Sequence, residues 1–158
     1  METKLTAKAF IQIQKSPEEI FHAIIHPEKM RHYFANGSAP LVTGDTVDWW
    51  FPEFPDHFPV VAGDIKPYTY ISFDWSGGIT GMLVEINLEA QPDGSTVVRL
   101  EEHQMEFTVE GVQQALQQTG GWANFLACLK GYLEYGIELR KGAFDFLKPA
   151  GCNSSLNT

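Results

Sequence analysis

The sequence has few of the residues on which several classes of protein depend. Its 158 residues include only two cysteines, Cys128 and Cys152, too few for a disulfide framework or for a zinc site made of thiolates alone. Its 11 basic residues are outnumbered by 20 acidic ones, which gives a formal net charge of −9. Because nucleic acids and anionic membranes are bound mainly through Lys and Arg, this balance argues against both as partners.

The chain also lacks long apolar stretches. No run reaches the ~18 apolar residues that a membrane-spanning helix needs. Residues 1–8 are polar and have no apolar segment of the kind found in a secretory signal. We therefore predict a cytoplasmic protein with no membrane partner.

Motifs for nucleophilic, phosphate and metal chemistry are missing as well. There is no G-x-S-x-G elbow, and the two Gly-Gly pairs indicate turns, not phosphate-binding loops. His22 and His26 are four residues apart, but no Glu follows His22 as it does in zinc proteases, so both are predicted to be surface histidines. Cys128 lies beside an apolar helical stripe and is predicted to be a buried, inert thiol. We predict no metal and no cofactor.

Aromatic side chains, by contrast, are abundant. The chain has 11 Phe, 5 Tyr and 4 Trp, or 13% of its residues, within a hydrophobic fraction of 44%. This composition and length are typical of one folded domain, which we expect over residues 1–148, followed by a small, polar, disordered tail over residues 149–158. The aromatic content exceeds what the core of such a domain requires.

The hydrophobic pattern predicts an α+β protein. Residues 4–14 alternate like a half-buried strand, and Ser16-Pro17-Glu18-Glu19 is typical of a helix start. The remaining predicted elements, in chain order, are a short helix over residues 27–34, strands between residues 46 and 104 interrupted by a loop rich in Phe and Pro over residues 51–59, a weak helix over residues 108–118 that breaks at Gly120-Gly121, and a long helix from Trp122 to Ile137. Runs of strands flanked by helices define the α+β class.

Seven stretches of the sequence, taken in order, resemble one known family. They are residues 16–24 with Pro27-Glu28 after them, 63–67, 71–75, 84–88, 96–100, 120–126 and 129–136. The resemblance is to the family of the activator of heat-shock-protein-90 ATPase, at its C-terminal domain, within the superfamily of lipid-transfer (START), birch-pollen-allergen and polyketide-cyclase domains. It implies the helix-grip fold, in which a curved antiparallel sheet wraps a long C-terminal helix and leaves an apolar cavity between them, with two short helices after the first strand.

The chain differs from that family's pattern at two places. Many relatives have a Trp after the second helix, where this chain has Tyr33-Phe34, and the aromatic insert over residues 51–59 is longer than the resemblance implies. Both differences fall where the resemblance places the mouth of the cavity. The insert is also a candidate contact between two copies of the chain, so a monomer and a homodimer both stay open.

Ten side chains are predicted to face the space between sheet and helix. They are Trp49, Phe51, Phe73, Trp75, Met82 and Val84 from strands, and Trp122, Phe125, Leu126 and Leu129 from the last helix. These rings line a ligand-binding cavity under one interpretation and fill a solid core under the other.

Two polar residues are predicted beside the same space. On the strand over residues 96–104, Glu102 and Gln104 share the inward face, and His103 points to the surface. Glu102 either faces the apolar space, where it could act as a general acid or base, or is solvated at the rim.

Three functions therefore stay open. The first is a small-molecule binding protein for an apolar or aromatic ligand, which the acidic chain indicates is not strongly anionic. The second, implied by the resemblance, is a partner of a heat-shock chaperone that stimulates its ATPase. The third is an enzyme of the cyclase or hydrolase kind, with Glu102 or Gln104 as weak candidates for proton transfer, so the sequence leaves open whether any catalysis occurs.

Overall fold

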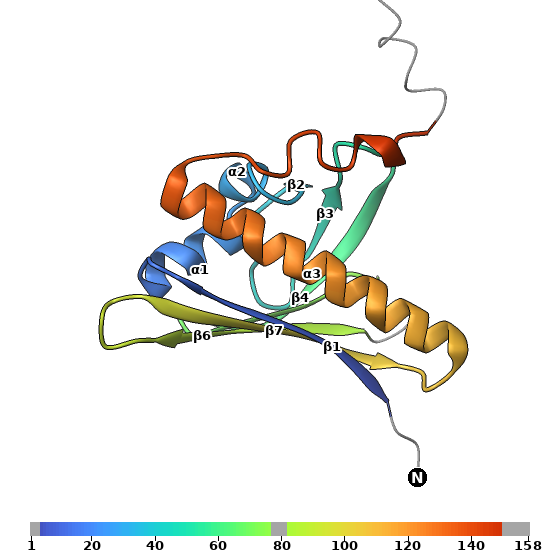
Figure 1. The fold of residues 1–158 in the computed structure, drawn as a ribbon, viewed down its shortest axis with the longest axis horizontal. Coiled ribbons are helices and arrows are strands. Elements are labelled where there is room, and N and C mark those ends of the chain that lie inside the picture. The colour runs from blue at the N-terminus through green and yellow to red at the C-terminus, as the bar shows by residue number, and fades with distance from the viewer. Residues whose placement is uncertain (1–3, 77–81, 150–158) are drawn as a thin grey trace, which may run out of the picture.

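A curved antiparallel sheet packs against one long helix. The computed structural model describes residues 4–76 and 82–149, and in these residues it shows a seven-stranded sheet of order β1-β7-β6-β5-β4-β3-β2 (Figure 1). The strands are β1 (Leu5–Ile13), β2 (Asn36–Gly37), β3 (Thr46–Trp50), β4 (His57–Lys66), β5 (Tyr70–Asp74), β6 (Leu83–Ala90) and β7 (Thr96–Met105). The helices are α1 (Pro17–Ile25), α2 (Pro27–Met30), α3 (Val109–Tyr135) and the short 3-10 helix η1 (Asp145–Leu147). The predicted α+β, helix-grip architecture is confirmed.

The helix start predicted after the first strand is present. Ser16 caps α1, because its hydroxyl accepts a hydrogen bond of 3.2 Å from the backbone N–H of Glu19, and Pro17 is the first helical residue. Pro27 begins α2 directly afterwards. The two short helices close one end of the sheet (Figure 1).

The predicted helix break at Gly120-Gly121 is wrong. Helix α3 runs without interruption for 27 residues, from a start capped by the hydroxyl of Thr108 to the left-handed Gly136, whose φ is 64°. Each glycine costs about 1 kcal/mol in a helix interior, but the apolar face that α3 buries against the sheet offsets this cost. The prediction that the helix extends to Ile137 is also wrong, because the chain turns at Gly136 and the Ile137 N–H bonds back to the carbonyl of Gly131.

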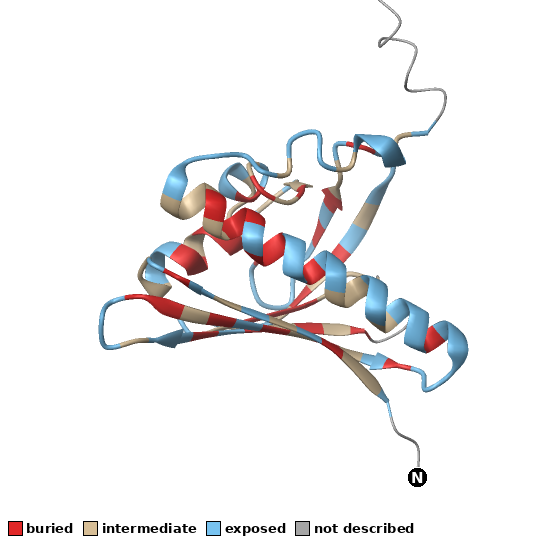
Figure 2. Cartoon of the chain, in the orientation of Figure 1, coloured by how far each residue is buried: buried red, intermediate tan, exposed pale blue. Residues whose placement is uncertain are grey.

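The core lies between the sheet and α3. Buried residues follow the inner face of the strands and the side of α3 that faces them (Figure 2). Trp49, Phe73, Leu126 and Leu129 are among the largest side chains with almost no exposed surface. The Gly-Gly pair at residues 77–78, predicted to form a turn, and the predicted tail from residue 150 onwards lie outside the described residues.

None of the helices in the described part of the chain has the length and apolar character needed to cross a membrane. The segment that follows α3 runs back over the helix toward the loop between β3 and β4 (Figure 1). An ion pair between Arg140 of that segment and Glu53 of that loop joins the two.

Candidate functional site

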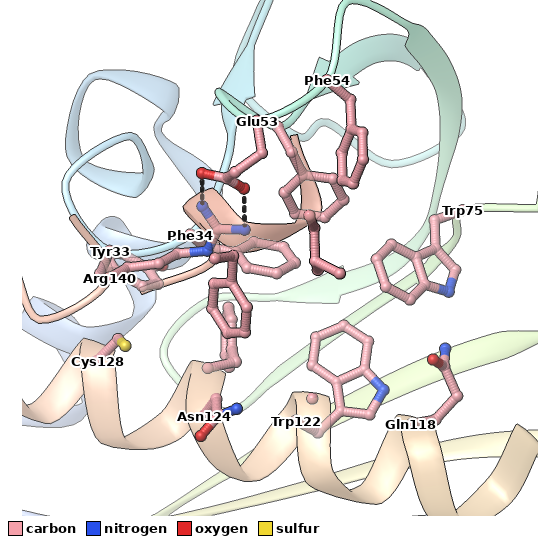
Figure 3. Close-up of a pocket in the computed structure, with 15 residues that line it drawn as sticks. Tyr33, Phe34, Glu53, Phe54, Trp75, Gln118, Trp122, Asn124, Cys128 and Arg140 are labelled. Atoms are coloured by element: carbon pink, nitrogen blue, oxygen red, sulfur yellow. Dashed lines mark hydrogen bonds and ion pairs between the residues drawn. The ribbon is translucent and has the colours of Figure 1, made fainter. Parts of the chain in front are cut away.

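A pocket opens at the edge of the contact between the sheet and α3, beneath the segment that follows the helix (Figure 3). It has a volume of about 220 Å³. Its lining residues come from five parts of the chain and are mostly aromatic: Tyr33, Phe34, Phe51, Glu53, Phe54, Trp75, Gln118, Gly121, Trp122, Asn124, Phe125, Cys128, Arg140, Phe144 and Leu147.

Phe34 is the centre of the aromatic cluster around this pocket. Its ring lies 4.8 Å from that of Phe125 and 5.4 Å from that of Phe51, in edge-to-face contacts, and 5.8 Å from that of Trp122. Such contacts hold rings at defined angles. Phe34 thus connects α3 to the loop between β3 and β4.

Glu102 lies behind two of the pocket's rings. It has no exposed surface, and its neighbours in register on the adjacent strands are Ala7 and Val84. One carboxylate oxygen accepts a bond of 2.7 Å from the Trp75 indole N–H; the other accepts bonds of 2.8 Å from the Trp122 indole and from the Gln118 side chain. We call the side of the pocket formed by Trp75, Gln118 and Trp122, with Glu102 behind it, the inner wall.

The carboxylate is the acceptor in all three of these bonds. An indole nitrogen and an amide NH₂ only donate, so none of the three donor groups can accept a proton from a carboxyl group. Figure 3 shows the indole nitrogens of Trp75 and Trp122 on the same side, toward Gln118. Glu102 therefore fixes the orientation of both rings, and both of its carboxylate oxygens already accept hydrogen bonds behind them.

The opposite side of the pocket, which we call the outer wall, consists of Phe51, Glu53, Phe54, Arg140 and Phe144. Arg140 binds Glu53 through two parallel hydrogen bonds of 3.0 and 2.7 Å, drawn as dashed lines in Figure 3. Its guanidinium carbon lies 5.1 Å from the ring centre of Phe51 and 4.9 Å from that of Phe144. Glu53 is only 5% exposed, so this is a largely desolvated, bidentate ion pair.

Cys128 lines the pocket from α3 and is buried, as predicted. Burial raises the pKa of its thiol, and the nearby positive charge of Arg140 opposes that rise. A thiol with a raised pKa is a poor nucleophile, which fits the predicted inert role.

The structure divides the ten residues predicted to face the cavity into two groups. Phe51, Trp75, Trp122 and Phe125 line the pocket. The other six are buried in the core: Trp49, Phe73, Met82, Val84, Leu126 and Leu129. Some of the predicted rings thus border a pocket, and others fill the interior.

The inward position predicted for Glu102 is correct, but its solvation at the rim is not, because it is fully buried. The position predicted for Gln104 is wrong. Its backbone has a φ of 76°, the pairing of β1 with β7 is irregular at this point, and the side chain is exposed while Met105 turns inward. A bulge of this kind shifts the alternation of a strand. Gln104 therefore lies away from the pocket.

His103 faces away from Glu102, as predicted, on the outer face of the sheet. Its Nε2 atom lies 2.6 Å from a carboxylate oxygen of Glu85 and 3.4 Å from one of Glu101. The three groups offer ligand atoms within 4.8 Å of one another, the only such set that could hold a metal ion among residues 4–76 and 82–149. Their contacts are those of an ion-pair cluster, and the cluster lies outside the pocket.

His22 and His26 stack on each other at 5.4 Å and are partly exposed.

Several pocket residues were absent from the sequence prediction. Phe34 could have been found, because it lies where the sequence departs from the pattern of its relatives. Glu53 and Arg140 are 87 residues apart and lie in segments without periodicity, so no local signal pairs them. Gln118 lies on the part of α3 that was predicted to end at the glycine pair.

Comparison with known proteins gives one family. A family model described as "Activator of Hsp90 ATPase homolog 1-like protein" matches residues 14–134. The comparison with curated proteins gave no match.

Solved structures with similar folds include several from bacteria. Protein SSP2350 from Staphylococcus saprophyticus is 27% identical, with a TM-score of 0.75 over 86% of this chain and 96% of that one. An Aha1 dimer from Colwellia psychrerythraea is 22% identical, with a TM-score of 0.71 over 84% and 98%. DynU16, a putative protein in the dynemicin biosynthetic locus, is 21% identical, with a TM-score of 0.71 over 84% of this chain and 48% of that one.

Proposed function

The chain belongs to the family of Activator of Hsp90 ATPase homolog 1-like proteins, and we propose that it acts as a small-molecule binding protein whose pocket takes an apolar or aromatic ligand. The observation that supports the proposal is the pocket wall, in which eight aromatic side chains from separate parts of the chain converge: Tyr33, Phe34, Phe51, Phe54, Trp75, Trp122, Phe125 and Phe144. Concave, mostly apolar sites with a few oriented polar groups are typical of small-molecule binding.

The size of the pocket indicates the size of the ligand. An apolar cavity of roughly 150 Å³ is enough to hold benzene. At about 220 Å³, this pocket has room for a ligand with one ring and a small substituent. Larger ligands require the outer wall to move.

Tryptophan fluorescence tests this proposal, because two of the four tryptophans line the pocket. We expect saturable changes with flat aromatic compounds in a panel that also contains fatty acids and sterols. Phe34→Ala should weaken the best ligand at least about tenfold, as expected for an aromatic anchor. The matched control Phe10→Ala, which removes a 71% exposed ring from β1, should leave binding unchanged. No response to any compound in the panel would count against the proposal.

A second candidate function is stimulation of a heat-shock ATPase. It is supported by the description of the matching family and by the similarity to Aha1 from Colwellia psychrerythraea. That protein is a dimer, which makes a homodimer of this chain worth testing by light scattering in the same samples. A pull-down with the heat-shock ATPase of the host, combined with an ATPase assay, decides this candidate: no binding and no stimulation would exclude it.

A further inference from the structure

We propose that the pocket selects an organic ammonium ion with an aromatic or apolar body, and that the buried carboxylate of Glu102 provides this selectivity through the indole rings of Trp75 and Trp122. The inference rests on the proposed small-molecule binding and adds the charge of the ligand. It begins from a feature of the inner wall that binding of a neutral apolar ligand leaves unexplained.

That feature is a buried carboxylate without a cationic partner among the described residues. Glu102 has no exposed surface, and the contacts recorded for it within the described residues are with two indoles and one amide, all neutral donors. A buried charge is costly unless it is paired, and three neutral hydrogen bonds only reduce this cost. A cation bound on the pocket side of the rings would complete the pairing.

The rings of the inner wall are suited to carry this charge to a ligand. A cation is attracted to the face of a tryptophan ring when it lies within about 6 Å of the ring centre, more strongly where water is excluded. Trp75 and Trp122 lie 4.9 Å apart at an angle of 39°, and both line the pocket. Each ring donates its N–H to the same carboxylate, and such a bond polarises the ring and makes its face more negative.

The other charges of the pocket do not cancel that of Glu102. Arg140 is the one cationic side chain among the described residues that line the pocket, and both branches of its guanidinium are bound by Glu53. That pair is neutral as a unit. Glu102 therefore leaves one uncompensated negative charge next to an aromatic surface, inside a chain whose net charge is already −9.

A pair of ligands with the same shape and different charge tests this inference. Trimethylphenylammonium and tert-butylbenzene differ in one atom, the charged nitrogen in place of a carbon. In fluorescence titrations we expect the full chain to bind the cation about tenfold more tightly than the neutral compound. Glu102→Gln should reduce this preference to about twofold or less.

The matched control is Glu101→Gln, which removes the same charge from the adjacent residue on the outer face of the sheet, and it should keep the full preference. Near-UV circular dichroism shows whether Glu102→Gln is folded. If it is not, Trp75→Phe replaces one indole by a ring without a donor and should lower the preference about threefold.

The outcomes distinguish failure of this inference from failure of the proposed function. Equal or tighter binding of the neutral compound by the full chain, or an unchanged preference in Glu102→Gln and Trp75→Phe, overturns the inference and leaves small-molecule binding standing. Failure of both compounds to bind overturns the inference and also counts against the proposed function.

Discussion

The two walls of the pocket each contain a buried carboxylate, and the two carboxylates are held in opposite ways. On the inner wall, Glu102 belongs to β7, between β1 and β6, and is bound by three neutral donors, one from the end of β5 and two from α3. On the outer wall, Glu53 belongs to a loop and is bound by one cation, Arg140, from another loop. One wall is part of the core, and the other is an ion pair between two irregular segments.

This difference determines how easily each carboxylate can reach water. Glu102 can reach water only if the sheet and α3 separate, so its charge and the two rings that it orients are fixed in the folded state. The Glu53–Arg140 pair can dissociate into water by movement of loops alone, which costs far less. Under the proposed binding function, the inner wall would recognise the ligand and movement of the outer wall would admit it.

The largest expected effect follows from removing the inner carboxylate. Glu102→Ala leaves two indole N–H groups and one amide without a buried acceptor, and at about 1 kcal/mol or more for each the free energy of unfolding should fall by about 3–5 kcal/mol. Urea denaturation measures the loss. Glu101→Ala, on the outer face, should cost less than about 1 kcal/mol, and an equal loss in the two variants would contradict the contrast between the walls.

Breaking the outer pair should have a smaller, local effect. Arg140→Gln leaves Glu53 without its cation, but the loops can expose Glu53 to water. We therefore expect the free energy of unfolding to fall by about 1–2 kcal/mol, with faster hydrogen exchange in residues 136–148.

Alkylation of Cys128 in a Cys152→Ser background reports the opening of this wall. Because Arg140 opposes the burial-induced rise in the thiol pKa, its removal alone slows alkylation. Faster alkylation in Arg140→Gln would thus reflect exposure, and an unchanged or slower rate would argue against a mobile outer wall.

The smallest effects are expected at two glycines, Gly120 within α3 and Gly136 at its C-terminal end. Gly136→Ala should cost about 1 kcal/mol, because its φ of 64° is unfavourable for any side chain. Gly120→Ala should instead stabilise the protein by about 0.5–1 kcal/mol, since an added Cβ meets open space within a continuous helix. Thermal unfolding of both variants checks the opposite signs, and destabilisation by Gly120→Ala would show that α3 is not continuous there.

The sequence predicted the inner wall better than the outer one. Alternation along β7 placed Glu102 on the inward face, and helical spacing placed Trp122 and Phe125 on the face of α3 that meets the sheet. These periodicities come from regular elements with one buried side. The same reasoning gave the wrong face for Gln104, because the positive φ of that residue changes the alternation of the strand.

The outer wall could not be derived in this way. Its residues lie in loops, where no period relates a side chain to a face, and the Glu53–Arg140 pair joins positions that only the folded chain brings together. Likewise, the burial of Glu102 depends on Trp75 and Trp122 covering it, which is a property of the assembled pocket and not of strand β7. The local sequence pattern predicts which way a side chain points, but tertiary packing determines whether that side chain is exposed.

The most direct test of the account uses the indole N–H signals of a ¹⁵N-labelled sample. Trp75 and Trp122 border the pocket, whereas Trp49 is buried in the core and Trp50 stacks on His57 at 4.3 Å, so each ligand titration contains its own controls. The account predicts that trimethylphenylammonium shifts the Trp75 and Trp122 signals, in a saturable manner, and leaves that of Trp50 in place. Unmoved Trp75 and Trp122 signals with both trimethylphenylammonium and tert-butylbenzene, or an equal shift at Trp50, would contradict it.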